Sequence, residues 1–380
     1  MSKLSKRFLV VTALLLAFCL VTTSCGRSKG RDDSGTIKIG VLVPVSGSEA
    51  FYGNDMYNSY ALAVDHVNAA GGVLGRNLEL LSPADDGCDA LMAAQAATMI
   101  TSQRPHFVVG GYCSGATIPA LQEFYDNDLV MLISAANSTR ITDLGLSQTF
   151  MINSPGTHAI DSLIMLMRHL GVTRVAVIHQ GDDYTQNLSD ICNQKLPPAG
   201  FQIVTTQVME KGAPDVSALV TAIRNSRAEF VYWGGYFADG GNVIRQLRQG
   251  GYTGYICAGD GSASTELITA AGPAGEGVFV TSPPYVEFSE GGAEFLAAYQ
   301  AKYNMLPDAY ATLSYDTIMV LKNAIEKAGT TDTAQVREQI QNINYSGLSG
   351  QISFAPNREL ATSNFIIIQI HNGAYRLYSL

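Results

Sequence analysis

The feature that most constrains the fold is a regular alternation of short, β-branched apolar runs with longer amphipathic stretches from Thr36 onward. The apolar runs are continuous rather than alternating, which is typical of strands buried on both faces of a parallel sheet. We therefore expect strands at residues 37–43, 78–81, 107–109, 130–133, 175–179, 230–232, 255–258 and 278–281.

The stretches between these runs have helical periodicity. Met56, Tyr60, Val64 and Val67 share one helical face, and this helix is predicted to end at 71–72, a glycine pair suited to a left-handed cap. Further helices are expected at residues 90–101, 116–126, 159–170, 184–195, 216–225, 242–249, 293–303 and 309–328. Strands that alternate with helices predict a doubly wound α/β fold.

The chain divides into two such units. The strand–helix alternation restarts after residues 153–157, and a second break falls at residues 281–285. Residues 351–354 and 365–371, followed by a turn and a last apolar run, are expected to form antiparallel strands. The predicted lobes are 36–154 with 286–344, and 155–285 with 345–380, joined by two or three crossings.

The N-terminus predicts export. Lys3, Lys6 and Arg7 precede an apolar run from Phe8 to Val21, which is shorter than the roughly 20 residues of a membrane-spanning helix. Residues 1–24 are therefore interpreted as a cleaved signal. The segment ends in small residues before Cys25 and resembles a bacterial lipobox, so Cys25 is the predicted lipidation site. The polar, Gly/Ser-rich stretch 25–35 is expected to be a tether.

Composition excludes several classes of partner. The chain has a net charge of −9 with no basic run in the body, which argues against nucleic acid and leaves the N-terminal lipid as the predicted membrane attachment. Beyond the signal, no apolar run is long enough to span a bilayer. An oxidising compartment permits disulfides among Cys88, Cys113, Cys192 and Cys257, and the spacing alone does not decide whether the last two are paired.

Signatures of catalysis, metals and cofactors are missing from the sequence. It contains no phosphate-binding G-x-x-x-x-G-K-[ST], no H-E-x-x-H and no C-x-x-C. The histidines are scattered without metal-ligand spacing: His66, His106, His158, His169, His179 and His371. An exported hydrolase with Ser114 as nucleophile is an alternative, although residues 111–115 depart from G-x-S-x-G and no motif pairs a histidine with an acid. We expect neither an enzyme nor a cofactor.

Polar residues instead follow the predicted strands, where open α/β sheets bind ligands. Ser114 comes after strand 107–109 and before a helix, a position that suits an anion. The stretch 134–139 follows strand 130–133, and Asp260 follows strand 255–258. Tyr184 and Tyr236 come just past strand ends in the second lobe. Neutral donors for a carboxylate, one acid for an ammonium and aromatic walls together suit a zwitterion.

These residues resemble the type I periplasmic binding proteins of the branched-chain amino acid (leucine/isoleucine/valine) class. The resemblance covers the chain after Thr36. It is carried, in order, by Ile39-Gly40-Val41, Ser46-Gly47, Tyr52-Gly53, Gly71-Gly72-Val73-Leu74-Gly75-Arg76, Asp85-Asp86, Cys88, Cys113-Ser114, Ser134 to Ser138, Phe230-Val231-Tyr232, Gly234-Gly235-Tyr236 and Gly259-Asp260-Gly261.

The resemblance implies a role for each site residue. Ser114 and the backbone at Ser138 would hold the ligand carboxylate, and the Ala136 carbonyl, the Ser138 hydroxyl and Asp260 would hold its ammonium. The remaining lining residues would be Tyr52, Tyr112, Asn137, Tyr184 and Tyr236. A disulfide between Cys88 and Cys113 would lie beside the pocket. Asp260 is one methylene shorter than the glutamate of the leucine binders, and Tyr112 replaces a smaller aliphatic residue, so the side-chain specificity is left open.

The resemblance also implies the biological role. We expect a monomeric lipoprotein of the periplasm or cell surface that closes on a free amino acid, branched-chain or otherwise apolar or aromatic, and delivers it to an ABC permease. A sensor of amides, urea or other small ligands in the same fold is the alternative, and it would leave Asp260 without an ammonium partner.

Overall fold

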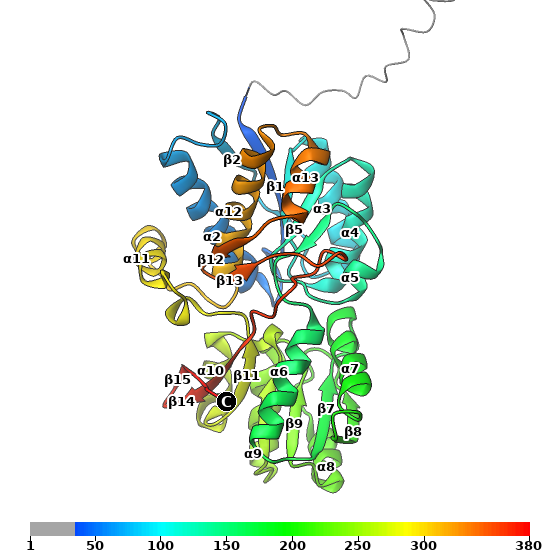
Figure 1. Ribbon diagram of the computed structural model, residues 1–380. Helices are drawn as coiled ribbons and strands as arrows, with labels where there is room; N and C mark the ends of the chain where they lie inside the picture. The colour runs from blue at the N-terminus through cyan, green and yellow to red at the C-terminus, as the bar shows by residue number, and fades with distance from the viewer. Residues whose placement is uncertain (1–34) are drawn as a thin grey trace, which may run out of the picture. The chain divides into compact units, whose positions relative to one another are not determined.

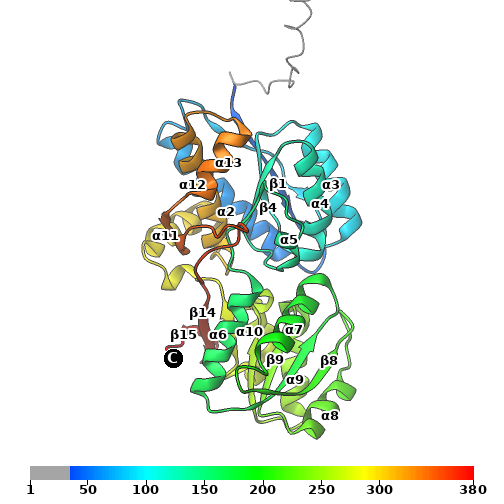
Figure 2. The ribbon, with the colours of Figure 1, turned by 45° about the vertical axis from the view of Figure 1, so that its right-hand side comes forward.

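The computed structural model describes residues 35–380. The predictions for the signal segment and for Cys25, and nearly all of the tether, lie outside the described residues. Residues 36–380 form one compact unit that contains two main sheets, each in its own lobe (Figures 1 and 2). Within the described range no helix combines the length and apolar composition that crossing a bilayer requires.

The first sheet has six strands, all parallel, in the order β2-β1-β4-β5-β6 with β3 also paired to β1. Its strands are β1 (Ile37–Val43), β2 (Leu78–Leu80), β3 (Ala84–Asp85), β4 (Phe107–Gly110), β5 (Val130–Ile133) and β6 (Thr149–Met151). Almost every residue of β1, β4 and β5 is buried, as their continuous apolar sequences predicted.

Helices cover both faces of this sheet (Figure 1). They are α2 (Ala50–Ala69), α3 (Ala90–Ser102), α4 (Ser114–Asp126), α5 (Arg140–Asp143), α12 (Ala311–Ala328) and α13 (Thr333–Gln341), with α11 (Gly292–Tyr303) packed on α2. The predicted face of α2 is buried, and the helix ends where Gly71 and Gly72 adopt positive φ angles of 107° and 75°. Asp89 caps α3 by accepting the amide protons of Leu91 and Met92.

The second sheet has seven strands in the order β15-β14-β11-β10-β9-β7-β8. Its parallel strands are β7 (Arg174–His179), β8 (Gln202–Val208), β9 (Phe230–Trp233), β10 (Tyr255–Ala258) and β11 (Phe279–Ser282). Two antiparallel strands complete the edge, β14 (Ile366–His371) and β15 (Ala374–Leu377). Its helices are α6 (Gly156–His169), α7 (Asp183–Lys195), α8 (Ser217–Ser226), α9 (Phe237–Gln249) and α10 (Thr265–Ala271). The doubly wound α/β prediction is confirmed.

The chain passes between the two sheets three times, after β6, after β11 and before β14. The first and third of these crossings lie side by side, because Ser154 Oγ donates to Asn364 Oδ1 at 2.6 Å and accepts from the Asn364 amide at 2.9 Å. Short 3₁₀ turns lie near the crossings and in the second lobe: η1 (Asp260–Ser262), η2 (Gly272–Gly275) and η3 (Val286–Phe288).

The C-terminal region differs from the prediction. Residues 351–354 do not pair with 365–371; instead a small hairpin forms between β12 (Tyr345–Gly347) and β13 (Gly350–Ile352), in contact with α12. Phe354 packs on Phe150 with ring centroids 5.1 Å apart, and the Met151 amide donates to the Arg358 carbonyl at 3.1 Å. Residues 345–360 therefore pack with the first sheet, whereas the sequence placed them in lobe 2. The polar stretch that follows is a crossing, not a hairpin turn.

Candidate interlobe site

The predicted ligand-binding residues gather where the two lobes meet. Each follows the carboxyl end of a parallel strand, except Tyr52, which comes from the first turn of α2. Each is at most 5% exposed: Tyr52, Tyr112, Ser114, Ala136, Asn137, Ser138, Tyr184, Tyr236 and Asp260. The parallel strands of both sheets thus direct their loops to one shared interface.

Two glycines allow the chain to turn sharply after β4. Gly110 has a φ of 132°, and a side chain there would meet the Leu42 carbonyl oxygen at 2.0 Å. Gly111 follows with a φ of 75°. The turn brings Tyr112 and Ser114 to the start of α4, directly beside the loop that follows β5.

Ser114 and Ser138 are in contact. The Ser138 amide donates to Ser114 Oγ at 3.3 Å, and the Arg140 amide donates to Ser138 Oγ at 3.3 Å. Both serines therefore lie at the N-terminus of α4, where the helix dipole and free amide groups favour an anion. Ala136 is held beside them by its own amide, which donates to the Gly111 carbonyl at 2.9 Å.

Asp260 joins the lobes. Its Oδ1 accepts from the Tyr184 hydroxyl at 2.7 Å, and its Oδ2 accepts from Asn137 Nδ2 at 2.8 Å, which belongs to the other lobe. Burial raises the pKa of Asp260 to about 6, an effect opposed by the Tyr184 hydrogen bond. The protonation state of this carboxyl group therefore depends on whether a cation or a neutral hydrogen-bond donor lies beside it.

Two further partners of Asp260 were not predicted. Asn153 Nδ2 donates to Asp260 Oδ2 at 3.4 Å, and the Tyr310 hydroxyl lies 3.3 Å from the same oxygen and 3.0 Å from the Asp260 carbonyl. Asn153 follows β6, a three-residue strand too short to be identified from its sequence. Tyr310 lies at the start of α12, away from any strand end, so the strand-end argument could not find it.

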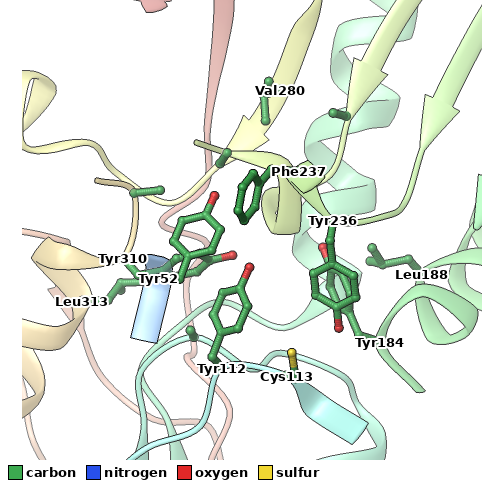
Figure 3. Close-up of a cluster of buried hydrophobic side chains, with 14 of the residues drawn as sticks. Tyr52, Tyr112, Cys113, Tyr184, Leu188, Tyr236, Phe237, Val280, Tyr310 and Leu313 are labelled. Carbon is green, nitrogen blue, oxygen red and sulfur yellow. The ribbon is translucent and has the colours of Figure 1, made fainter. Parts of the chain in front are cut away.

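Aromatic rings from both lobes pack against one another (Figure 3), and two of them, Tyr184 and Tyr310, are hydrogen-bonded to Asp260. The Tyr52 ring centroid lies 4.9 Å from that of Tyr112, 5.1 Å from Tyr310 and 5.2 Å from Phe237 of the second lobe. Tyr236 bridges the set, with its centroid 5.3 Å from Tyr184 and 6.3 Å from Tyr112. These rings form an apolar wall with hydroxyl groups at its edges.

An additional buried acid, Glu49, lies beside Tyr112 of this wall. It is 1% exposed, and Glu49 Oε2 accepts from the Tyr112 hydroxyl at 3.3 Å. Burial raises the pKa of Glu49, while attraction to Lys211 of the second lobe lowers it. The sequence analysis did not identify Glu49, although it lies in the loop that follows β1, because it comes six residues past the end of that strand.

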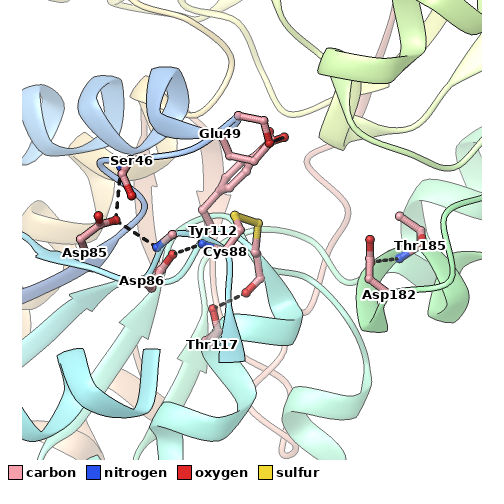
Figure 4. Close-up of a disulfide and its surroundings, with 12 residues drawn as sticks. Ser46, Glu49, Asp85, Asp86, Cys88, Tyr112, Thr117, Asp182 and Thr185 are labelled. Atoms are coloured by element: carbon pink, nitrogen blue, oxygen red, sulfur yellow. Dashed lines mark hydrogen bonds between the residues drawn. A yellow bond between two sulfur atoms is a disulfide. The ribbon is translucent and has the colours of Figure 1, made fainter. Parts of the chain in front are cut away.

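A disulfide links Cys88 to Cys113 next to this acid (Figure 4), with Cα atoms 5.3 Å apart. It ties the loop after β3 to the residue that precedes Ser114, so it restrains the position of the α4 N-terminus. Cys192 and Cys257, left open by the sequence, are free and buried. Among residues 35–380 no group of three histidine, cysteine or acidic side chains is arranged to hold a metal ion.

Comparison with known proteins identifies the family. The sequence profile of the periplasmic binding proteins matches residues 36–374. The chain belongs to this family. The resemblance to the type I proteins of the branched-chain amino acid class is confirmed by relatives that bind these amino acids and by the structure of a leucine-binding protein.

Three relatives illustrate the similarity. A leucine-, isoleucine-, valine-, threonine-, and alanine-binding protein of Pseudomonas aeruginosa is 28% identical over 90% of this chain and 91% of its own length. The crystal structure of a leucine-binding protein of Thermotoga maritima has a TM-score of 0.83 at 27% identity, covering 90% of this chain and 98% of that one. A Streptococcus pneumoniae branched-chain amino acid transporter substrate-binding protein, crystallised with isoleucine, has a TM-score of 0.80 at 26% identity, covering 90% and 97%.

Proposed function

We propose that this member of the periplasmic binding protein family captures a free amino acid between its lobes and delivers it to an ABC permease. The observation that carries the proposal is the placement of Asp260, a buried carboxyl group at the lobe interface, beside the serines at the α4 N-terminus. An acid for the ammonium and an anion-favouring helix terminus for the carboxylate complement a zwitterion. The names of the relatives, which are binding proteins for amino acids, support the same conclusion.

Two unsatisfied acceptors also favour a ligand that donates hydrogen bonds. Asn137 Oδ1 and Asn153 Oδ1 are buried and accept no hydrogen bond from residues 35–380, although the Nδ2 atoms of both side chains donate to Asp260. A buried polar atom without a partner costs roughly 1–3 kcal/mol. An ammonium group next to Asp260 has three protons to donate and would relieve this cost.

Binding would require the lobes to separate and close again. Asp260 is hydrogen-bonded across the interface, so a ligand can enter only when these contacts open. We propose residues 36–154 and 286–360 as one lobe and residues 155–285 and 361–380 as the other, moving about the crossings. Contacts to a ligand from both lobes would stabilise the closed arrangement.

The test is a thermal-shift screen of the mature chain against the L-amino acids, urea and small amides. A ligand at 100 times its dissociation constant stabilises the folded state by about 2.7 kcal/mol. We expect at least one amino acid to raise the melting temperature, and calorimetry should then give its affinity. If only urea or amides raise it, the same fold serves as an amide sensor and the amino acid proposal is wrong.

Attachment to a membrane is a separate proposal that rests on Cys25. If Cys25 is lipidated, Cys25→Ser should move the exported protein from the membrane fraction to the soluble fraction without changing ligand affinity. Cys192→Ser is a matched control, because that thiol is buried inside the folded body. A Cys25→Ser protein that still sediments with membranes contradicts the lipidation proposal.

A further inference from the structure

Glu49 has no role in recognising the common part of an amino acid. Asp260, Ser114 and Ser138 are the residues proposed for the ammonium and the carboxylate, and the hydrogen-bond partners of Glu49 among residues 35–380 are other residues. Its side chain instead accepts from the Ser48 hydroxyl at 3.0 Å and from the Tyr112 hydroxyl at 3.3 Å. A buried acid at a ligand-binding interface therefore remains to be explained.

A series of aromatic side chains connects Asp260 with Glu49. Tyr184 holds Asp260, Tyr236 packs on Tyr184, and Tyr112 lies between Tyr236 and Glu49 (Figures 3 and 4). An amino acid held by Asp260 and Ser114 would lie along this wall. Its side chain would then point towards Tyr112 and Glu49.

The second lobe also contributes a cation near Glu49. Lys211 Nζ lies 5.2 Å from the centroid of the Tyr236 ring, and Lys211 attracts Glu49 electrostatically. Nevertheless, the two hydrogen bonds that Glu49 accepts come from neutral hydroxyl groups, and one of them is long. Burying a carboxyl group is costly unless it is well paired. If the ligand side chain were aliphatic, an apolar residue at position 49 would pack against it without the free-energy cost of burying a carboxyl group.

We propose that Glu49 recognises the side chain of the ligand, and that the ligand is an amino acid whose side chain donates a hydrogen bond. This inference rests on the proposed amino acid binding and goes beyond it by naming the class. The side chain would carry an amide, a hydroxyl or an ammonium group, with its carbon atoms against Tyr52, Tyr112 and Tyr236. Branched-chain amino acids, which have no such donor, would bind more weakly.

The experiment is calorimetry of the wild-type chain with a panel of amino acids, followed by two substitutions. We expect the tightest ligand to have a donor on its side chain. Glu49→Met keeps the length and removes the acceptor, so it should weaken this ligand at least tenfold while the affinity for leucine stays the same or rises. Glu49→Gln keeps an acceptor without the charge, so it should weaken an ammonium ligand strongly and an amide or hydroxyl ligand only slightly.

Glu294→Met is the matched control, because Glu294 is exposed on α11 and the same chemical change there should leave all affinities unaltered. The inference is overturned if leucine, isoleucine or valine is the tightest ligand, or if Glu49→Met changes the affinity of the tightest ligand less than threefold. Leucine binding by Glu49→Met shows that this variant is folded. A wild-type chain that binds no amino acid overturns both the inference and the proposed function.

Discussion

Asp260 and Glu49 are both buried carboxyl groups at the lobe interface, but their surroundings differ. Asp260 accepts hydrogen bonds from Tyr184 of its own lobe and from Asn137 of the other. Among residues 35–380, Glu49 accepts hydrogen bonds from Ser48 and Tyr112 of its own lobe, and its interaction with the second lobe is an electrostatic attraction to Lys211. Asp260 is therefore fixed in place by both lobes, as expected of a residue that binds the ammonium group shared by all amino acids. Glu49 is less constrained, as expected of a residue that selects among amino acids by their side chains.

The largest effect is expected when the charge of Asp260 is removed. Asp260→Asn keeps the shape of the side chain but leaves a ligand ammonium without its ionic partner. Affinity for the best amino acid should fall by roughly 2–5 kcal/mol, the range for losing one partner of a buried charge pair. Calorimetry should also show a much smaller loss for a deaminated analogue of the same ligand.

If Asp260→Asn had little effect on ligand affinity, the proposed difference in role between Asp260 and Glu49 would be wrong. An affinity within about threefold of the parent, less than 1 kcal/mol, means that Asp260 is not the ammonium partner. Asp260→Ala is a second probe, since it removes the hydrogen bonds to Asn137 and Tyr184 as well as the charge. The alanine variant should bind no better than the asparagine variant.

The two acids also show how far sequence reasoning reaches. Asp260 was identified because it follows the apolar strand β10, and strand ends in α/β folds lie at one edge of the sheet. Glu49, Asn153 and Tyr310 were missed. Their positions depend on contacts between segments far apart in the chain, such as the Tyr310–Asp260 hydrogen bond across 50 residues.

The fold shows the same division between local and long-range signals. Continuous apolar runs such as β1 and β5 were predicted with their bounds, because burial on both faces leaves a local pattern. The strand β8 (Gln202–Val208) was not predicted, since it lies at the edge of the second sheet and is half exposed and polar. The lobe to which 345–360 belong could not be predicted either, because it is decided by the contact between Phe354 and Phe150.

A smaller effect is expected from pH, again through Asp260. Burial raises its pKa to about 6, so the carboxyl group of the folded chain is protonated below about pH 6 and ionised above it. For folding alone, this contributes stability below about pH 4 that is lost as the pH rises to about 6. A ligand ammonium reverses the preference, because it requires the ionised carboxylate. Affinity should therefore fall by up to about tenfold per pH unit below pH 6.

Calorimetry at pH 7.0 and 5.0 measures this dependence, and the Asp260→Asn chain provides the comparison. The variant cannot ionise at this position, so its affinity should depend less on pH than that of the parent. Equal pH dependence in the two proteins would assign the titration to another buried acid, and Glu49, whose pKa is also raised by burial, is one candidate at the interface.

The smallest effect is expected at the exposed edge of the interface. Arg140 on α5 forms salt bridges across the lobes with Asp183 at 2.7 Å and Asp190 at 3.1 Å, and all three side chains are about 40% exposed. Exposed ion pairs contribute only about 0.2–1 kcal/mol each and are screened by salt. At about 0.5 kcal/mol each, the two pairs together contribute about 1 kcal/mol, so Arg140→Gln should weaken ligand binding by about fivefold at low salt, and by less at high salt.

The matched control for Arg140 is an exposed ion pair within one lobe. Lys322 and Glu326 are paired along α12 at 2.7 Å, so Lys322→Gln removes a similar interaction without affecting contacts between the lobes. Its ligand affinity should equal that of the parent at every salt concentration. If Arg140→Gln lowered affinity more than tenfold and salt made no difference, Arg140 would be acting as a buried partner of the ligand, as Asp260 is proposed to do. The interpretation of Arg140 as an exposed residue outside the buried binding site, with ion pairs that salt screens, would then be wrong.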